Sequence, residues 1–331
     1  MGKTILVTGG AGYIGSHAVH ELLLKGYEPV ILDNFSTGHR GFTQGCEIIE
    51  CDLRDPASTA KACGHRTFDA VMHFAAMSIV GDSVKDPISY FENNVAGSVN
   101  LIKAALNSGV QSFVFSSTAA VYGEPQAETI DEQHPVNPVN PYGRSKLMVE
   151  SILSEVYKAN QFASISFRYF NAAGAVEDAS LGEDHSPETH LIPNILNSCL
   201  AGGSQSVNVF GTDYDTRDGS CVRDYIHVSD LARAHVLGLE YVQNHGGCEA
   251  VNLGTQAGSS VFEVIAACEA STGRTIPYSI KGRRAGDPAT LIADNKKALE
   301  LIDWSPQLTL DDCVEDAWRW HQLRSKRLYR N

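Results

Sequence analysis

Eight residues near the start of the chain, TGGAGYIG at 8–15, constrain the fold more than any other segment. They follow the apolar run 5–7 and precede a helix-like segment at 16–25, so the order is strand, glycine turn, helix. The spacing G-x-x-G-x-x-G allows a tight turn and lets the backbone approach a pyrophosphate at the positive N-terminus of the helix. The segment therefore predicts a dinucleotide-binding unit.

An acidic residue stands where such a unit needs one. The apolar run 29–32 is interpreted as the second strand, and Asp33 follows Gly15 by 18 residues. That is close to the roughly 20 residues expected before a carboxylate that hydrogen-bonds the adenosine ribose. Because a carboxylate there repels a 2′-phosphate, the cofactor is predicted to be NAD rather than NADP. Arg40 lies nearby and weakens this preference only slightly.

Strand-like runs alternate with helical segments along the first half of the chain. The runs interpreted as strands are 4–8, 30–33, 47–51, 70–74, 112–116 and 164–169. This alternation predicts an α/β fold with a doubly wound, Rossmann-type parallel sheet, which binds ligands beyond the carboxyl ends of its strands. The side chains that we expect at those ends are Asp33, Asp52, Ala75, Ala76, Ser116, Ser117, Thr118 and Asn171.

The composition of the chain changes after Gly174. Residues 175–220 are rich in Asp, Glu, His, Gly and Ser, with one helical stretch near 191–200. We predict an NAD-binding domain at 1–174 and a smaller α/β substrate domain at 175–331. Segments such as 222–250 are expected to pack back on the first domain.

The overall charge narrows the range of partners. The chain has 331 residues and a net charge of −13, which argues against nucleic acid or an anionic membrane surface. No apolar run reaches the roughly 18 residues of a membrane span. The first residues are already strand-like, which leaves no room for a signal peptide, and the eight cysteines are scattered. We therefore expect a cytoplasmic protein.

Metal ligation has little support in the sequence. No two cysteines form a C-x-x-C pair, so neither a zinc site nor a redox motif is predicted. His185, Glu188 and His190 could serve as ligands, but there is no further strong partner at ligand spacing. We predict no metal site.

A Tyr-x-x-x-Lys pair, Tyr142 and Lys146, follows Pro141, where a helix is expected to start. The i, i+4 spacing puts both side chains on one helix face. A lysine ammonium and a positive nicotinamide ring beside a tyrosine favour phenolate, which makes a general base near neutral pH. Taken alone, the pair more often marks an amphipathic helix with its lysine in solvent. Here the hydroxyls of 116–118 precede it by 24 residues, and one of them can share the substrate proton.

The glycine turn, the hydroxyl strand end and Tyr-x-x-x-Lys, in this order, resemble the extended branch of the short-chain dehydrogenase/reductase superfamily. Within it, essentially the whole chain resembles the UDP-glucose 4-epimerase family. The segments that carry this resemblance are HFAA at 73–76, NNV at 93–95, VYG at 121–123, RYFN at 168–171, VRDYIHV at 222–228 and RRAGD at 283–287.

The resemblance implies a set of site residues. The catalytic residues would be Tyr142, Lys146, Thr118 and Ser116. NAD would be held by Gly9, Gly12, Tyr13, Ile14, Gly15, Asp33, Asn34, Asp52, Leu53, Phe74, Ala75, Ala76, Asn94, Ser116, Tyr142, Lys146, Tyr169 and Phe170. A UDP-sugar would be held by Thr118, Asn171, His190, Leu191, Asn208, Phe210, Arg223, Tyr225, Arg284, Asp287 and Leu291. The family also implies a homodimer built on helices around 96–107 and 146–160.

The family comparison also selects a reaction. Related dehydratases carry Asp-Glu after the strand-end hydroxyl, and related decarboxylases carry a Glu before Val-Tyr-Gly, whereas this chain has Ala119 and Ala120 in both places. Interconversion of UDP-glucose and UDP-galactose by oxidation at C4, rotation and re-reduction is therefore the expected activity. The alternatives are a 4-epimerase acting mainly on UDP-N-acetylhexosamine or UDP-pentose, and a non-catalytic NAD-binding sensor on the same fold.

Four positions bear on substrate contacts. Ser78 stands where many members have a lysine, Thr118 replaces a serine, and His190 replaces an asparagine, which puts uridine or phosphate contacts there in doubt. The resemblance implies that family members restricted to hexoses have a tyrosine at the position of Leu291. Leucine is smaller, so we expect it to leave room for an N-acetyl group. The other interpretation of Leu291 is an ordinary core residue on a strand.

Overall fold

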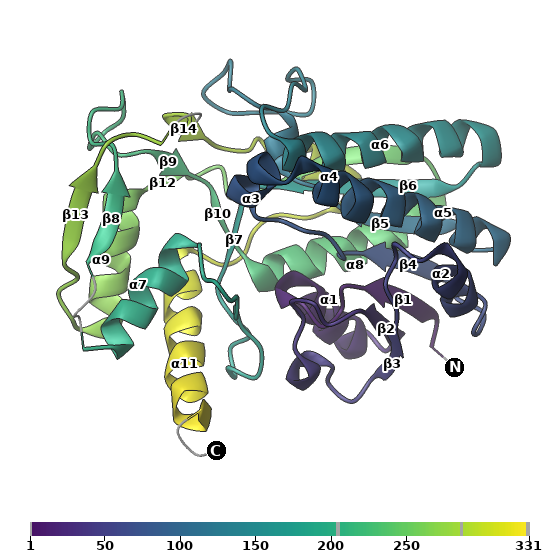
Figure 1. Ribbon diagram of the computed structural model, residues 1–331. Coiled ribbons are helices and arrows are strands. Elements are labelled where there is room, and N and C mark those ends of the chain that lie inside the picture. Colours follow the sequence, from purple (N-terminus) through teal and green to yellow (C-terminus); the bar gives the residue numbers. More distant parts are fainter. Residues whose placement is uncertain (1, 203–205, 285–286, 329–331) are drawn as a thin grey trace.

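The computed structural model describes residues 2–202, 206–284 and 287–328. Its centre is a seven-stranded sheet in the order β11-β6-β5-β4-β1-β2-β3, with every neighbouring pair parallel. Its strands are β1 (Thr4–Thr8), β2 (Glu28–Asp33), β3 (Glu47–Glu50), β4 (Ala70–His73), β5 (Ser112–Ser116), β6 (Ala163–Tyr169) and β11 (Cys248–Leu253). The predicted doubly wound α/β fold is confirmed (Figure 1).

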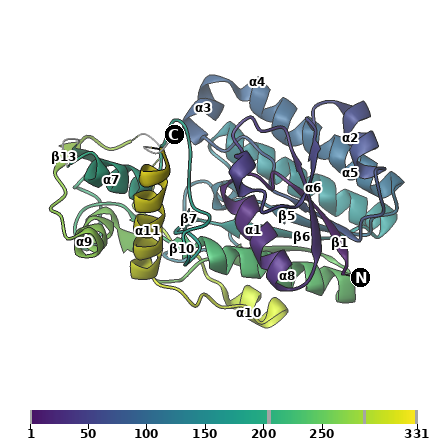
Figure 2. The same ribbon diagram turned by 90° about the horizontal axis from the view of Figure 1, so that it is seen from below.

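Alternate side chains of each strand enter different cores on the two faces of this sheet. Ile5, Val7 and Ile31 belong to one core, whereas Leu6 and Val30 belong to the other. This is the pattern expected of a parallel sheet that is covered on both sides. The first core is closed by α1 (Tyr13–Leu24), α8 (Val228–His245) and α10 (Lys296–Ile302), and the second by α2 (Pro56–Cys63), α5 (Gly97–Asn107) and α6 (Pro141–Asn160) (Figure 2).

Short elements connect β4 to α5 and β5 to α6. They are α3 (Val80–Lys85), α4 (Pro87–Tyr90), a π-helical segment at Phe91–Ala96 that continues into α5, and a 3-10 turn at Ala119–Val121. Another 3-10 turn, Arg40–Phe42, follows β2. All of these connections after β2, β4 and β5 leave from the carboxyl ends of the strands, which is where such sheets place their ligands.

The second part of the molecule has its own core. Helices α7 (Leu191–Leu200), α9 (Val261–Thr272) and α11 (Leu310–Leu328) pack together beside the parallel pair β8 (Val207–Phe210) and β13 (Tyr278–Lys281) (Figure 1). A capping box of Ser260 and Glu263 starts α9. Between the two parts lie two small sheets made of β7 (Asn171–Ala173), β10 (Tyr225–His227), β9 (Val222–Arg223), β12 (Ser259–Ser260) and β14 (Thr290–Leu291).

The chain returns to the large sheet after entering the second part. Helix α8 packs against α1, and β11 pairs with β6 in the register Val251↔Phe167. A boundary at residue 174 would therefore separate the large sheet from α8 and β11, which belong to its layers. The division into two domains stays a prediction. Among the described residues, no helix is both long and apolar enough to cross a bilayer.

Candidate active site

The glycine turn packs against the end of β4 so closely that side chains are excluded. Gly9 has φ +68°, and a Cβ there would lie 2.6 Å from the backbone nitrogen of Ala75. A Cβ on Gly15 would lie 2.1 Å from the carbonyl oxygen of Gly9. Helix α1 begins at the N-cap residue Gly12, which has no side chain to cap the first N–H groups. The turn thus presents a helix N-terminus open to an anion, which fits the pyrophosphate of NAD.

Tyr13 links this turn to the second part of the chain. Its hydroxyl donates a hydrogen bond to the carbonyl oxygen of Gly174 at 2.8 Å, and its ring meets the edge of His185. Burial raises the pKa of Tyr13 well above its ordinary value. The side chain therefore acts as a tether, and a contact with NAD stays a prediction for its backbone and for Ile14.

Asp33 is buried at the end of β2, and its carboxylate oxygens accept hydrogen bonds from the backbone nitrogens of Ala11 at 3.0 Å and Phe35 at 2.8 Å. Each oxygen retains further accepting capacity, so a ribose hydroxyl can still bind. Arg40 is occupied elsewhere, since its guanidinium lies 4.1 Å from the centroid of the Phe35 ring and pairs with Glu50. Arg40 is thus engaged by other groups, so it weakens the predicted preference for NAD even less.

The neighbouring site predictions fall on the same edge of the sheet. Asn34 donates to Asp52 at 3.3 Å, and the hydrogen bond from Arg54 lowers the pKa of Asp52 to about 2. Leu53 is buried and faces Gly97, where a Cβ would lie 3.3 Å from it. These residues form the rim beyond β3.

Asn94 is committed to the protein's own structure. In the π-helical segment, its Oδ1 accepts from the nitrogen of Met77 at 2.8 Å and from Asn93, and its Nδ2 donates to Met77 and to Ser145. These four bonds use the whole capacity of the amide. The side chain thus fixes the loop after β4 against α6, and the predicted contact with NAD is not supported by a free amide.

His73 at the end of β4 is a residue that the sequence analysis quoted but gave no role. Its ring nitrogens bond Thr8 at 2.6 Å and Ser98 at 2.8 Å, and burial lowers its pKa to about 3. The neutral ring joins β1, β4 and α5 directly below the loop of Phe74, Ala75 and Ala76. In the sequence, the position of this histidine at the end of a buried strand was the available signal.

Helix α6 brings the Tyr-x-x-x-Lys pair onto the sheet edge. Asn140 caps the helix by accepting from the nitrogen of Gly143 at 2.8 Å, and Pro141 occupies the first turn. A Cβ on Gly143 would lie 2.4 Å from the carbonyl oxygen of Ala120. The glycine between Tyr142 and Lys146 therefore lets α6 approach the 3-10 turn after Thr118.

Four polar groups meet there, and we call Ser116, Thr118, Tyr142 and Lys146 the catalytic edge. Nζ of Lys146 donates to the carbonyl oxygen of Ser116 at 2.8 Å and lies 5.9 Å from the centroid of the Tyr142 ring. The Ser116 hydroxyl bonds the Tyr169 hydroxyl at 2.6 Å. The structure thus brings the predicted catalytic residues together beside the glycine turn, with Tyr169 added.

Burial dominates the electrostatics of the catalytic edge. It raises the pKa of Tyr142 to about 12, although a hydrogen bond with Thr118 opposes the rise. Burial also lowers the pKa of Lys146 to about 7, against the favourable charge of Glu150. In the protein alone the phenol is therefore neutral, and the phenolate that the sequence analysis expected needs a positive charge beyond that of Lys146.

A buried network behind the catalytic edge escaped the sequence analysis. Glu150 forms a buried ion pair with Arg168 at 2.5 Å and accepts from the Ser117 hydroxyl at 2.5 Å. Arg168 also donates to the Tyr122 hydroxyl at 3.0 Å, which in turn donates to Asn252. Glu150 follows Lys146 by four residues on the same helix face, and this spacing was the available signal. The motif arginine of RYFN therefore supports α6 and the sheet.

The predicted sugar-nucleotide residues gather where the two parts of the chain meet, and we call Phe210, Arg223, Arg284 and Asp287 the anion wall. Arg223 pairs with Asp287 at 2.6 Å. The guanidinium of Arg284 lies 3.9 Å from the centroid of the Phe210 ring. The segment between Arg284 and Asp287, residues 285–286, lies outside the described residues. The two predicted cations thus face the same small region from β9 and from the segment after β13.

Leu291 is half-buried and pairs in register with Arg223 through β14 and β9. It packs with Phe170 against the cluster of Ala119, Val121 and Tyr122. Its side chain therefore lies between the anion wall and the catalytic edge, which supports a place near the sugar more than a place in the deep core.

The remaining substrate predictions are spread over neighbouring elements. Asn171 and Tyr225 pair in register through β7 and β10. Leu191 is the first residue of α7, and Asn208 is exposed on the same face of β8 as Phe210. His190 is engaged within its own segment, since its Nδ1 lies 2.7 Å from Glu183 and 3.1 Å from Glu188, and its contact with the nucleotide stays a prediction.

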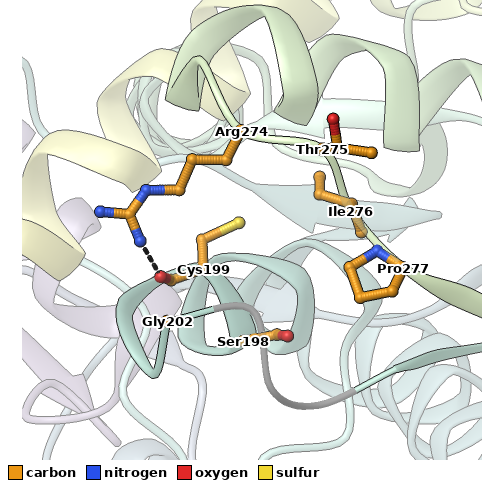
Figure 3. A pocket seen from close by; sticks show the side chains of 7 residues that line it. All are labelled: Ser198, Cys199, Gly202, Arg274, Thr275, Ile276 and Pro277. Carbon is orange, nitrogen blue, oxygen red and sulfur yellow. Dashed lines mark hydrogen bonds between the residues drawn. The ribbon is translucent and has the colours of Figure 1, made fainter.

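Asp224, which stands inside the VRDYIHV motif, received no role from the sequence. Its buried carboxylate accepts from the nitrogens of Thr255, Gln256 and Ala293 and from the Thr255 hydroxyl. It fixes the strands that carry Arg223 and Leu291. A separate cavity of about 380 Å³ lies between α7 and β13, where Arg274 donates to the carbonyl oxygen of Cys199 (Figure 3). None of its lining residues is a predicted site residue.

The fold and this site define a class of protein. The chain belongs to the NAD dependent epimerase/dehydratase family, whose model matches residues 5–254. The predicted family is therefore confirmed, and so is NAD as the cofactor.

Individual relatives are more specific. The chain is 49% identical over 320 residues to the UDP-glucose 4-epimerase of Rhizobium leguminosarum bv. trifolii, covering 97% of this chain and 98% of that protein. It is similar to the crystal structure of UDP-glucose 4-epimerase from Brucella ovis in complex with NAD, with 44% identity, a TM-score of 0.93 and coverage of 96% and 98%. It is also similar to the UDP-Glc/GlcNAc 4-epimerase from Campylobacter jejuni, with 40% identity, a TM-score of 0.85 and coverage of 97% and 100%.

Proposed function

We propose that this chain is an NAD-dependent UDP-sugar 4-epimerase that interconverts UDP-glucose and UDP-galactose. The observation that carries the proposal is the catalytic edge, in which Thr118 and Lys146 are buried and Tyr142 is half-buried beside a glycine turn that fits NAD. The names of the relatives from R. leguminosarum and B. ovis support the same substrate.

The side chains of the catalytic edge divide the chemistry. The glycine turn and Asp33 would hold NAD, whose nicotinamide ring would supply an acceptor for the hydride from C4 of the sugar and a donor for its return to the opposite face. Tyr142 takes the proton from the 4-hydroxyl and gives it back, and Thr118 shares that proton through its hydroxyl. Lys146 holds a positive charge next to the phenol, and Ser116 fixes its ammonium through a backbone carbonyl.

The anion wall holds the nucleotide while the sugar turns. Arg223 and Arg284 offer guanidinium groups that bind a diphosphate in a bidentate manner. They also provide local positive charge in a chain whose net charge is −13. Because the diphosphate stays anchored, the 4-keto sugar can rotate without leaving the pocket.

Elimination and decarboxylation have no obvious acid or base here. Ala119 and Ala120 occupy the positions where related dehydratases and decarboxylases carry carboxylates. The nearest buried carboxylate behind the edge, Glu150, is paired with Arg168 and Ser117. Epimerisation is the reaction that these residues support best.

The assay that tests this proposal offers UDP-galactose, UDP-N-acetylgalactosamine and UDP-arabinose to the purified protein without added NAD. We expect UDP-galactose to be converted to UDP-glucose, because each cycle regenerates the cofactor. A stable 4-keto-6-deoxy product, or no turnover of any of the three, would contradict the proposal. The latter outcome would leave a non-catalytic sensor.

A broader substrate range is a second candidate, and Leu291 favours it. Leucine lacks the ring and hydroxyl of tyrosine, and its position beside Phe170 and Arg223 leaves more room near the sugar. The relative from C. jejuni is named for both UDP-Glc and UDP-GlcNAc. We therefore expect measurable epimerisation of the N-acetylated sugars in the same assay.

We also propose a cytoplasmic homodimer. Support for the location comes from eight free cysteines, which suit a reducing compartment. Support for the dimer comes from exposed apolar side chains on the two helices that the family implies, Val99 on α5 and Met148 on α6. Light scattering on the purified protein would show twice the mass of the 35.8 kDa chain.

A further inference from the structure

Four potential metal ligands converge in the segment between β7 and α7. They are Glu183, His185, Glu188 and His190, and their ligand atoms all lie within 4.8 Å of one another. Three of them are candidate ligands in the sequence, but no metal was predicted because the sequence offers no further ligand at a suitable spacing. The structure adds Glu183, so the sequence prediction rested on an incomplete set.

The nitrogen–oxygen distances in this cluster lie near those of a coordination sphere, and two of the four fall within its range. Nδ1 of His190 lies 2.7 Å from Glu183 and 3.1 Å from Glu188, and Nδ1 of His185 lies 3.1 Å from Glu183 and 3.8 Å from Glu188. With metal–ligand bonds of about 2.1 Å, adjacent ligand atoms of a tetrahedral or octahedral site stand about 3.0–3.4 Å apart. The same nitrogen of each imidazole faces both carboxylates.

The surroundings favour a cation in the middle of the cluster. The side chains of Glu183 and Glu188 are only 5% and 11% exposed, so their two negative charges are poorly solvated. The backbone carbonyl of Glu183 accepts from the Trp320 indole at 3.0 Å, which holds that residue against α11. A third histidine, His321, is buried close enough for both carboxylates to affect its pKa, and its Nε2 has no partner.

We propose that Glu183, His185, Glu188 and His190 bind one divalent first-row transition metal, of the class that includes zinc. Two imidazoles and two carboxylates form a mixed nitrogen and oxygen set, which suits zinc and its neighbours better than calcium or magnesium. In the metal-free cluster the imidazoles carry protons toward the carboxylates, and the metal replaces them.

Such a metal would be structural rather than catalytic. It would join Glu183, which is fixed to α11, to His190, which is the N-cap residue of α7. The next residue, Leu191, belongs to the proposed substrate pocket, and the ring of His185 touches Tyr13 beside the glycine turn. The metal would thus hold one wall of the pocket at a distance from the reacting atoms.

The test uses the full chain with its cofactor, purified without a polyhistidine tag and treated with a chelator, and Co²⁺ as the probe. We expect about one Co²⁺ per chain with the visible absorption of nitrogen and oxygen ligation and no sulfur-to-cobalt charge transfer. His185→Asn and Glu188→Gln should each weaken binding at least about 10-fold. Both residues are only partly buried, and melting temperatures would verify that the variants fold.

A second histidine–glutamate pair provides the matched control. His65 contacts Glu47, the first residue of β3, at 2.8 Å, and His65→Asn should bind Co²⁺ as tightly as the unchanged protein. The proposal is overturned if no stoichiometric Co²⁺ binds, if His185→Asn keeps full affinity, or if the spectrum shows thiolate ligation. Because the readout is metal binding, the result does not depend on the substrate.

Discussion

The catalytic edge and the anion wall are built in opposite ways. In the catalytic edge, Ser116, Thr118 and Lys146 are buried and Tyr142 is half-buried, and the ammonium of Lys146 is bonded to the carbonyl oxygen of Ser116 at the end of β5. The anion wall is half-exposed, and its principal contact joins Arg223 to Asp287, which are 64 residues apart on a two-residue strand and a connecting segment.

The two regions therefore have different tasks. The catalytic edge positions the reacting groups, and the anion wall exchanges one binding partner for another. We expect the catalytic edge to hold its geometry with or without a ligand, because α6, β5 and β6 fix it. The anion wall must instead exchange partners, since a diphosphate can bind Arg223 only by replacing or sharing Asp287. Substitutions in the first region should therefore act on kcat, and substitutions in the second on KM.

The largest effect is expected from Tyr142→Phe, which removes one hydroxyl and leaves the packing in place. The base is lost, so kcat should fall by about 10²–10⁴ while NAD stays bound. Steady-state kinetics with UDP-galactose and the absorbance of retained cofactor provide the measurements. Tyr278→Phe, at a half-exposed ring on β13, is the control and should behave as the unchanged protein. Full turnover by Tyr142→Phe would break the assignment of the base.

The second effect concerns Lys146 and the pH dependence of stability. Its folded pKa of about 7 lies below the ordinary value of 10.5, so above pH 7 the unfolded chain binds more protons at this group. The contribution of Lys146 to stability should therefore rise with pH between about 7 and 10, with a limiting slope of about 1.4 kcal/mol per pH unit.

Urea unfolding of cofactor-stripped protein at pH 7, 8 and 9 would measure this slope. Lys146→Met lacks the titrating group, so its free energy of unfolding should rise less steeply than that of the unchanged protein. Parallel pH profiles for the two proteins would show that the ammonium is not destabilised by burial.

The third effect is in the anion wall. Arg223→Ala should raise KM for the UDP-sugar by about 10–100-fold with a smaller change in kcat, since a charge-assisted hydrogen bond contributes about 1.5–3 kcal/mol. Arg217→Ala removes another arginine, paired with Glu263 at the surface, and should leave both constants unchanged. A fall in kcat with an unchanged KM would contradict the expectation that the anion wall acts on KM.

A smaller effect is expected at the cofactor rim. Asp33→Asn removes the charge but keeps a carbonyl oxygen for the backbone nitrogen of Ala11 or Phe35. The ratio of NADP to NAD affinity should rise roughly tenfold, because the repulsion of the 2′-phosphate is lost. Titration of both cofactors into stripped protein provides the measurement, and an unchanged ratio would place Asp33 away from the ribose.

The smallest effect on the hexose reaction is expected from Leu291→Tyr. Added bulk beside Phe170 and Arg223 should abolish turnover of UDP-N-acetylglucosamine and change that of UDP-galactose by no more than about twofold, through steric exclusion. Equal loss of both substrates would make Leu291 a core residue of this region.

The sequence predicted the large sheet well, because its strands are apolar and bounded by clear turns. The limits of β1 and β5 agree with the predicted runs. The first residues of β11, which begins at Cys248, are only half-buried and lack an apolar signal. Strands of two or three residues, such as β9 and β14, have no periodicity that a sequence could reveal.

The site was predictable to the extent that it follows local spacing. Tyr142 and Lys146 share one helix turn, and Ser116 and Thr118 end one strand. The pairing of Arg223 with Asp287 and the approach of Glu183 to His190 depend on how distant or irregular segments fold together. Nor could spacing show that the amide of Asn94 is fully used by Met77, Asn93 and Ser145.

The bond between Tyr13 and Gly174 has a consequence for how long the cofactor stays. Tyr13 lies in the first turn of the helix that is predicted to face the pyrophosphate, and Gly174 follows β7 directly. Any opening between the two parts must therefore break a buried hydrogen bond anchored in the nucleotide turn itself. We therefore expect the residence time of the cofactor to depend on this joint as well as on the direct contacts.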